Sequence, residues 1–399
     1  MPTDQLPDPV IMVPGITATV LRDFYDLPPT GIWGIMTQNF ERVALHPEDR
    51  RYEAALPAQV RAEEALELAY REMVLDLRHD LTAKKDRPVP VYSFGYDWRQ
   101  PLEQSQTQLA AFVTEVIEKT CLTRHYHEDG YLNRRRVNLL GHSMGGMIIT
   151  GYLSDELKAG RKPRVNRVAT VVTPFRGSLK AVEKLILGTT NRREREAARL
   201  TPSLYYLLPS FTEHIAIAPS LPQSFFDVKF WQKGVLETVQ EALRVYGSGE
   251  VAATAANAKK VLDAMLDAAK AHRAMMEAFI PASAGLKAED WLCVRGYGNK
   301  TRYGLKVDDT PAGPIFDLLD DSLIGDDDQP SFRTGDGTVP WAGSKAAFPV
   351  VEQALSPKDF RILELEEKVL MMKADLHAII PNMDKLQGHL RNHFAVRRP

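Results

Sequence analysis

Short apolar runs rich in β-branched residues alternate along the chain with stretches in which apolar residues recur every three or four positions. The first pattern is typical of buried strands and the second of helices that pack one face against a sheet. The predicted strands are residues 10–13, 89–94, 137–140, 168–172, 292–294 and 360–363. Residues 58–79 and 104–119 are predicted to form helices between them. This alternation predicts an α/β fold with a mostly parallel sheet and helices on both faces.

Two segments interrupt the alternation. Residues 22–57 have no clear period and contain Trp33 with several prolines and glycines, which predicts either a lid-like loop near a binding site or a plain irregular excursion. Residues 177–290 are too many for a crossover between two core strands, so we expect an inserted, largely helical cap. The predicted core therefore comprises residues 1–176 and 291–399.

Residues 251–279 of the predicted cap are rich in alanine and place larger apolar side chains on one face of a long helix. The residues of this face follow three- and four-residue spacing; they are Leu262, Met265, Ala269, His272, Met276 and Phe279. Two interpretations stay open. The face either packs within the cap or contacts an acyl chain, since methionine suits adaptable surfaces.

Composition narrows the class of protein. With 399 residues and 44% hydrophobic content the chain can bury a large core, as one domain with an insertion or as two domains. The formal net charge of −2, with both signs interspersed, argues against nucleic-acid binding. The two cysteines, Cys121 and Cys293, lie far apart and match no metal spacing. With only two cysteines we expect no disulfide-rich secreted fold, although a single bridge stays open.

The N-terminal residues 1–9 are polar and rich in proline, without the charged start and apolar stretch of a secretory signal. No segment of the sequence is long and apolar enough to span a bilayer. We therefore expect a soluble, cytoplasmic protein, and leaderless export remains the alternative.

The sequence GHSMG at residues 141–145 carries the most specific chemical signal. It follows the strand-like run 137–140 and precedes an apolar helical start, which is the context of a nucleophile elbow. Glycines are needed there because strand and helix pass close to each other around a strained serine. Ser143 is therefore the predicted nucleophile of a serine esterase or acyltransferase, and a serine in an ordinary glycine turn is the alternative.

A serine hydroxyl is a weak nucleophile, so it needs a histidine to accept its proton and a carboxylate to orient that histidine. With a nucleophile elbow the order along the chain is serine, acid, histidine. Asp336 is the predicted acid because the sequence TGDGTVP at 334–340 places it in a tight glycine turn; an Asx turn that only satisfies its own backbone is the alternative. His377, among apolar residues beyond the last predicted strand, is the predicted base. His142 is expected to pack under the elbow.

Ester hydrolysis through a tetrahedral intermediate also needs two donors for the oxyanion. We predict the backbone N–H of Met144, directly after the nucleophile, and that of Ile16, because residues 13–17 form a tight turn after the first strand. No metal or organic cofactor is expected, since the chain supplies nucleophile, base and donors itself. The polar stretch 125–129, with two histidines and two acidic residues, is expected to be a solvated loop instead of a zinc site.

Five segments, in the same order, resemble the lecithin:cholesterol acyltransferase-like group of α/β-hydrolases, which includes phospholipid:diacylglycerol acyltransferases and the lysosomal acyl-transferring phospholipase. They are VPG at 13–15, GYDWR at 95–99, GHSMGG at 141–146, GDGTVP at 335–340 and His377 near the C-terminus. The resemblance implies an α/β-hydrolase fold and phospholipid or neutral glycerolipid esters as acyl donors. It also implies that the GYDWR run lines the site, so Tyr96 and Trp98 are expected substrate contacts. Thr17, in the turn at 13–17, is a third expected contact.

The GYDWR run also has a plainer interpretation, a turn at a strand end with a buried tryptophan and an ion pair between Asp97 and Arg99. Secreted members of the family carry a signal sequence and a disulfide-closed lid loop, and this chain shows neither, so extracellular action is not expected. Ile16 stands where relatives often have a polar residue. A backbone donor does not need a polar side chain, so the predicted role of Ile16 is unaffected.

The sequence thus predicts a serine hydrolase of lipid esters that works through an acyl-enzyme and makes transient contact with a membrane or lipid surface. Transfer of the acyl group to a lipid alcohol is the alternative within enzymes. A non-catalytic lipid-binding module is the alternative from another class, and ordered candidates for all three triad members favour the enzyme. No protein partner is specified by the sequence.

Overall fold

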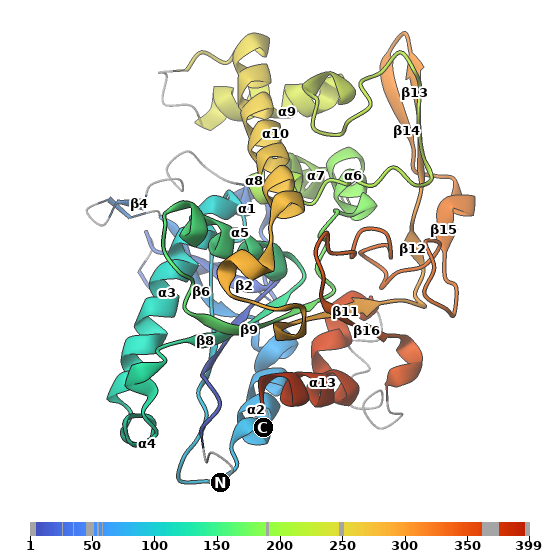
Figure 1. Cartoon of the computed structure of the whole chain (residues 1–399). Coiled ribbons are helices and arrows are strands. Elements are labelled where there is room, and N and C mark those ends of the chain that lie inside the picture. The colour runs from blue at the N-terminus through green and yellow to red at the C-terminus, as the bar shows by residue number, and fades with distance from the viewer. Residues whose placement is uncertain are drawn as a thin grey trace.

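A parallel β-sheet lies at the centre of the computed structural model of the protein (Figure 1). The structure describes residues 5–25, 27–34, 36–44, 52–53, 56–57, 59–188, 191–246, 251–360 and 375–395. Among these residues, six parallel strands form the sheet in the order β16 (Val351–Leu355), β11 (Trp291–Gly296), β9 (Val165–Val171), β8 (Val137–His142), β1 (Val10–Val13) and β7 (Val91–Ser93). The α/β class predicted from the apolar runs is confirmed.

Strand β1 shows why its sequence is apolar at every position. It is paired on both sides, with Ile11 opposite Tyr92 of β7, so neither edge is open. Successive side chains of a strand point to opposite faces. Ile11 and Val13 accordingly belong to one buried hydrophobic cluster and Val10 and Met12 to another. Strand β1 supplies both cores, and all four of its positions are apolar.

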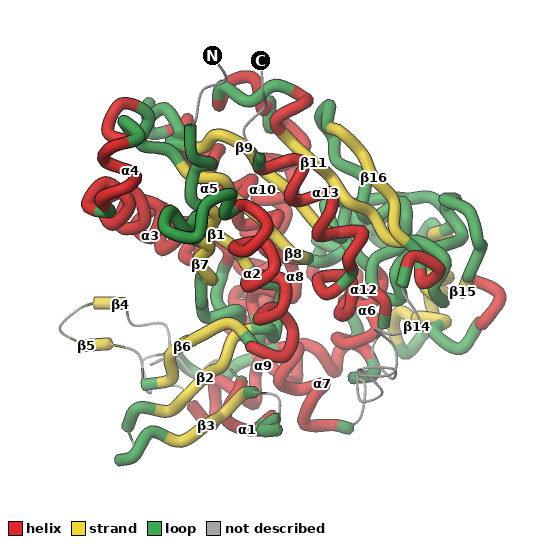
Figure 2. The backbone as a smooth tube through the Cα atoms, turned by 90° about the horizontal axis from the view of Figure 1, so that it is seen from below, coloured by secondary structure: helices red, strands yellow, loops and turns green. Residues whose placement is uncertain are grey.

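Helices cover both faces of this sheet, as Figure 2 shows from below. Helices α3 (Leu102–Leu122) and α5 (Met144–Lys158) pack together over one face, and α2 (Glu67–Leu81) and α13 (Asp384–Phe394) cover the other. Each pair contributes to its own hydrophobic cluster, so the sheet separates two cores. Helix α3 confirms the helix predicted at 104–119.

The helix predicted at 58–79 is wrong in its first part. Residues Val60–Ala65 form strand β6, and helix α2 begins only at Glu67. Strand β6 is paired antiparallel with β2 (Thr19–Asp23), and the ladder of main-chain hydrogen bonds holds these residues extended. A partner some forty positions away thus decides the conformation here, and the apparent helical spacing is fortuitous.

The segment 22–57, expected as an irregular loop, contains regular elements among its described residues. Strands β2, β3 (Thr30–Trp33) and β6 form a small antiparallel sheet, and the short helix α1 (Phe40–Val43) follows β3. Strands β4 (Tyr52–Glu53) and β5 (Leu56–Pro57) make a separate two-stranded pair. Short elements of this kind leave no periodic trace in the sequence, which explains why the pattern missed them.

The chain between β9 and β11 is mainly helical and lies above the sheet in Figure 1. Its elements are α6 (Leu179–Ile186), α7 (Arg192–Arg199), α8 (Pro202–Tyr206), β10 (Ile215–Ile217), α9 (Lys233–Tyr246) and α10 (Ala255–Ala278). This mainly helical region lies where the sequence predicts the cap. Its bounds as a domain, 177–290, stay a prediction, because β10 pairs with β13 (Leu305–Thr310) and β13 with β14 (Gly313–Asp317), both of which follow β11.

The apolar face of α10 points into the protein. Its residues Leu262, Leu266, Ala269 and Met276 are at most 2% exposed, and α10 contacts α9, α8 and α5. This burial supports the interpretation in which the face packs inside the protein.

The edge strand β16 was not predicted, because its first two residues, Val351 and Glu352, are exposed and the run is not apolar throughout. Pairing with β11 makes it a strand. Of the strand predicted at 360–363 only Phe360 is described, after a short 3₁₀ turn, and the rest lies outside the described residues.

Two further expectations concern cysteines and membranes. Cys121 and Cys293 are both free, so no disulfide joins them. None of the helices in the described parts of the chain is long and apolar enough to cross a membrane.

Candidate active site

Ser143 occupies the turn between the end of β8 and the start of α5. Its backbone has φ 53° and ψ −126°, a region that residues with a side chain rarely adopt and that costs about 1–3 kcal/mol. The strand, the sharp turn and the helix are the elements predicted for a nucleophile elbow. The serine therefore sits at the carboxyl edge of the sheet, where open α/β sheets bind their ligands.

Glycines around Ser143 allow three backbone segments to meet. A Cβ on Gly141 would lie 2.6 Å from the backbone nitrogen of Gly146. A Cβ on Gly145 would overlap the carbonyl oxygen of Val13, at the end of β1. Side chains at these positions would push α5 away from β8 and β1, so the glycine pattern reports real close approach.

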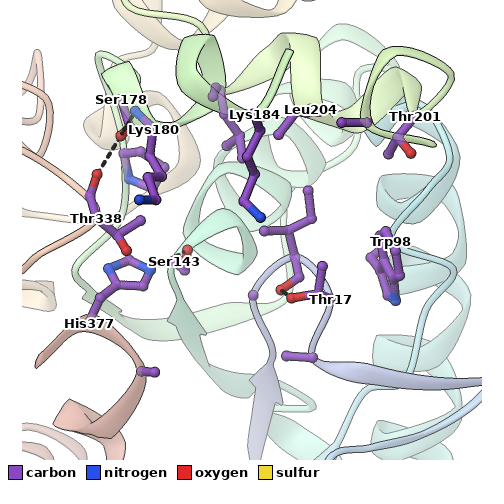
Figure 3. A pocket seen from close by; sticks show the side chains of 18 of the residues that line it. Thr17, Trp98, Ser143, Ser178, Lys180, Lys184, Thr201, Leu204, Thr338 and His377 are labelled. Carbon is purple, nitrogen blue, oxygen red and sulfur yellow. Dashed lines mark hydrogen bonds between the residues drawn. The ribbon is translucent and has the colours of Figure 1, made fainter. Parts of the chain in front are cut away.

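The three predicted triad residues meet in one place, and Figure 3 shows Ser143 and His377 side by side. Nε2 of His377 lies 2.8 Å from Oγ of Ser143, and Nδ1 lies 2.8 Å from Oδ2 of Asp336. Asp336 is 1% exposed and His377 is 8% exposed. Carboxylate, imidazole and hydroxyl thus form one hydrogen-bonded series at the edge of the sheet.

The turn after Asp336 orients its carboxylate. The N–H groups of Thr338 and Val339 donate to Oδ1 at 2.9 and 2.7 Å, which leaves Oδ2 for His377. Gly337 has φ 97°, a conformation that favours glycine. The Asx turn weighed as an alternative is therefore present, and it uses one oxygen while the other faces the histidine.

His377 lies on α12 (Leu376–Ile379), a helix of only four residues. Hydrogen bonds hold both the N–H and the carbonyl group of its main chain. Its N–H donates to the carbonyl of Asp336 at 2.9 Å, and its carbonyl accepts from Nε2 of His142 at 2.9 Å. The position of the imidazole ring therefore depends on the acid turn and the elbow as well as on α12.

The turn after β1 lies against the serine. A Cβ on Gly15 would be 2.9 Å from Cβ of Ser143, and Ile16 lines the same cavity as Ser143. Within the described residues, no hydrogen bond occupies the N–H group of Ile16 or of Met144. Both predicted oxyanion donors are thus close to the serine with no competing acceptor.

A cavity of about 600 Å³ opens beside this group (Figure 3). Its wall combines residues from the turn after β1, the segment around β3 and α1, and the helices α6 to α8. Apolar lining side chains include Ile16, Trp33, Phe40, Trp98, Leu204 and Leu207. The volume lies in the range of small-ligand sites, and the lining suits an apolar chain.

Two of the three expected substrate contacts line the cavity, and the third does not. Thr17 and Trp98 line the cavity. Tyr96 does not line it: its ring is buried and its hydroxyl donates to the carbonyl of Pro14 at 2.9 Å, so it supports the turn from behind. The plainer interpretation of this run also holds, because Nη2 of Arg99 lies 2.7 Å from Oδ2 of Asp97.

Several polar cavity residues were not identified from the sequence. Lys180 and Lys184 come from α6, and Figure 3 shows Lys184 directed into the cavity, with its Nζ 3.2 Å from Oε1 of Glu194 on α7. Asp375 also lines the cavity, and burial raises the pKa of its carboxyl. The spacing of four positions between the two lysines is the one signal that marks them as neighbours on a helix face.

Helix α6 is also tied to the acid turn. The hydroxyl of Ser178 donates to the carbonyl of Thr338, the dashed line in Figure 3. This bond links the start of the inserted region to the residues that hold Asp336.

The polar stretch 125–129 is not a loop as expected. Residues Arg124–Glu128 form the short helix α4, and His125 Nε2 donates to the carbonyl of Pro88 at 3.0 Å. In the described ranges no group of three or more histidine, cysteine or acidic side chains is arranged to hold a metal ion.

The family model described as "Lecithin:cholesterol acyltransferase" matches residues 83–346, which include Ser143 and Asp336. No curated protein sequence matches the chain.

Two solved structures resemble the protein. A chain of "The crystal structure of Tle4-Tli4 complex" has 14% sequence identity and a TM-score of 0.61, with 98% of this chain and 98% of that chain covered. "Crystal structure of Bacillus licheniformis lipase BlEst2 in mature form" has 12% identity and a TM-score of 0.28, with coverage of 62% and 78%. The first similarity is one of fold over almost the whole length.

Proposed function

The chain belongs to the lecithin:cholesterol acyltransferase family, and from this premise we propose that it is a serine hydrolase of lipid esters. Membership in this family makes the protein an enzyme that acts on lipid esters, either an esterase or an acyltransferase. The proposal adds a nucleophile, Ser143, a base, His377, and an acid, Asp336. It also assigns water as the main acyl acceptor.

The observation that carries the proposal is the hydrogen-bonded series from Asp336 through His377 to Ser143 beside an apolar cavity. Lipid binding alone does not require a serine hydroxyl that is hydrogen-bonded to an oriented imidazole. A strained backbone at Ser143 likewise serves no packing purpose, and such strain is retained where function requires it.

In the first half of the reaction, Oγ of Ser143 attacks the ester carbonyl carbon while Nε2 of His377 accepts the hydroxyl proton. The carbonyl oxygen becomes an oxyanion, which the N–H groups of Ile16 and Met144 stabilise. His377 then gives its proton to the leaving alcohol. An acyl-enzyme on Ser143 remains, and Asp336 stabilises the imidazolium throughout.

In the second half, His377 removes a proton from water, and the hydroxide oxygen attacks the acyl carbon. Collapse of the second tetrahedral intermediate returns the proton to Oγ of Ser143 and releases a fatty acid. A lipid alcohol in place of water would yield a new ester. The apolar lining of the cavity favours that second acceptor wherever it excludes water.

We also propose that the protein contacts lipid surfaces. Tyr25 and Leu27, on the turn between β2 and β3, are 81% and 93% exposed. Strand β3 ends at Trp33, which lines the cavity. Apolar side chains at this turn are suited to enter the interface of a bilayer that holds the ester substrate.

Lipid product analysis tests the proposal. Wild type and Ser143→Ala are incubated with mixed phospholipid and triacylglycerol vesicles that contain a long-chain alcohol, and the exposed Ser283→Ala serves as the matched control. We expect free fatty acid from wild type and from the control and none from Ser143→Ala. A Ser143-dependent ester of the added alcohol would identify acyl transfer, and turnover by Ser143→Ala at the wild-type rate would overturn the mechanism.

A further inference from the structure

Three buried hydrogen bonds connect the turn after β1, helix α2, the elbow and helix α12. The N–H of Gly15 lies 3.0 Å from the hydroxyl of Tyr70. That hydroxyl lies 2.7 Å from Nδ1 of His142, and Nε2 of His142 lies 2.9 Å from the carbonyl oxygen of His377. Tyr70 is 2% exposed and His142 is 6% exposed.

The proton positions in this series follow from its two ends. The carbonyl oxygen of His377 only accepts, so Nε2 of His142 carries the hydrogen. A neutral imidazole then has an acceptor at Nδ1, which takes the hydroxyl hydrogen of Tyr70. The oxygen of Tyr70 in turn accepts from Gly15. Each donor finds an acceptor, and one tautomer of His142 satisfies the whole series.

Burial keeps both side chains in these forms. Burial, together with the nearby His377, lowers the pKa of His142 to about 3. Burial also raises the pKa of Tyr70 well above its ordinary value. The imidazole and the phenol are therefore both neutral across the pH range in which an esterase works.

Three members of the series lie next to, or belong to, proposed catalytic residues. Gly15 precedes Ile16, one of the oxyanion donors, and His142 precedes the nucleophile Ser143. The carbonyl that accepts from His142 belongs to the base, His377, on a helix of four residues. Four short segments from distant parts of the chain are thus held at fixed spacing by hydrogen bonds.

We propose that Tyr70 and His142 are positioning residues that hold the oxyanion turn and the base in register with the nucleophile. This inference rests on the proposed function. Neither side chain transfers a proton to the substrate. Their contribution is to keep the donor of Ile16 and the ring of His377 at distances that the transition state requires, since small misplacements strongly reduce rates.

The test uses Tyr70→Phe, which removes one oxygen atom and keeps the ring. The N–H of Gly15 and Nδ1 of His142 then both lose their hydrogen-bond partner. A buried polar group without a partner costs a free energy that corresponds to roughly a tenfold change or more in an equilibrium constant. We expect kcat on a soluble short-chain ester to fall about tenfold with KM within twofold of wild type. Circular dichroism and thermal unfolding would show that the variant folds.

Tyr126→Phe is the matched control. Its ring is also fully buried, and its hydroxyl donates to the carbonyl of Pro7 at 2.8 Å, on a helix outside the site. We expect a loss of thermal stability similar to that of Tyr70→Phe but the wild-type kcat. Equal kcat losses in the two variants would show a general effect of lost stability and would overturn the inference.

Two further readouts separate positioning from plain packing. In protein with ¹⁵N-labelled histidines, the ring nitrogens of His142 should report hydrogen at Nε2 alone in wild type and a mixture of tautomers in Tyr70→Phe. His142→Gln keeps an N–H group for the carbonyl of His377, whereas His142→Leu does not. We expect His142→Gln to retain about tenfold more kcat than His142→Leu.

The outcomes distinguish the two proposals. A wild-type protein without Ser143-dependent turnover would refute the proposed function, while the nitrogen shifts would still test the hydrogen-bond series. An active enzyme whose kcat is unchanged in Tyr70→Phe, or equal His142→Gln and His142→Leu variants, would overturn the positioning role alone.

Discussion

Nε2 of His377 lies 2.8 Å from Oγ of Ser143, although 234 positions separate the two residues in the sequence. The pair meets because β8 ends at the same edge of the sheet to which the C-terminal part of the chain returns. Asp336 reaches the other side of the imidazole from the region after β11. The catalytic series therefore depends on the packing of three distant segments of the chain.

Replacing the acid should disable the base without unfolding the protein. In Asp336→Asn the amide oxygen can still accept from Thr338 and Val339, but the amide group imposes the wrong tautomer on His377. We expect kcat to fall by about 10⁴. Asp317→Asn, at another turn where the carboxylate accepts two N–H groups, is the control and should keep full activity. Activity of Asp336→Asn within tenfold of wild type would contradict the assignment.

The elbow glycines should differ in how well a second change rescues them. A Cβ on Gly145 meets the backbone of Val13, which cannot be removed, whereas a Cβ on Gly146 meets the side chain of Thr173. We expect Gly145→Ala and Gly146→Ala each to destabilise the protein by about 1–3 kcal/mol, as overpacking does. Adding Thr173→Ala should recover part of the loss for Gly146→Ala only, as urea unfolding would show. Equal recovery for both glycines would contradict the close approach.

The cavity predicts a change in acyl-chain preference. Leu204 lines it on α8, so the larger ring of Leu204→Trp should fill part of the space. We expect at least a tenfold loss of kcat/KM for long-chain esters, with short-chain esters within about threefold of wild type. Leu204→Met conserves the volume and should leave the preference unchanged. A uniform loss across chain lengths in Leu204→Trp would argue against the cavity as the acyl site.

Buried neutral histidines predict a loss of stability in acid. Burial lowers the pKa of His272 to about 3, far below its ordinary value. The imidazole of His272 therefore stays unprotonated in the native state, whereas in the unfolded chain it binds a proton below about pH 6.5. As the pH falls from about 6.5 to 3, His272 lowers the free energy of unfolding by about 1.4 kcal/mol per pH unit. Above about pH 6.5 His272 does not change the free energy of unfolding.

Urea unfolding at pH 7 and pH 5 measures this effect. His142 has the same shift and should contribute equally. We expect His272→Gln, in which the amide can still bond to Gln106, to show a weaker pH dependence than wild type. The same slope in both proteins would mean that His272 is not buried neutral.

The exposed turn between β2 and β3 predicts a difference between soluble and vesicle substrates. We expect the double variant Tyr25→Ser with Leu27→Ser to lose at least tenfold in rate on phospholipid vesicles, since burial of even one apolar side chain is worth about 1.5–3 kcal/mol. Its rate on a soluble ester should stay near wild type. Leu122→Ser, an equally exposed leucine at the end of α3, is the control. Equal vesicle rates in all three proteins would contradict membrane contact at this turn.

The sequence by itself determined the features that depend on neighbouring residues. A buried parallel strand such as β1 is apolar at every position, and β8 is largely apolar, so both are visible without a structure. The elbow around Ser143 needs small residues at close range, and the turn at Asp336 needs glycine next to it. Local sterics and burial restrict which residues these elements can contain, so short stretches of sequence are enough to predict them.

Only the tertiary structure decided the features that depend on distant partners. Strand β6 is extended because it pairs with β2, and β16 is a strand because it pairs with β11. Tyr96 supports the turn after β1 instead of lining the cavity because the carbonyl of Pro14 lies beside its hydroxyl. The bonds that join Tyr70, His142 and His377 likewise cross up to 235 positions of sequence. No local pattern encodes such contacts, because a hydrogen bond depends on where two groups lie in space and not on their spacing along the chain.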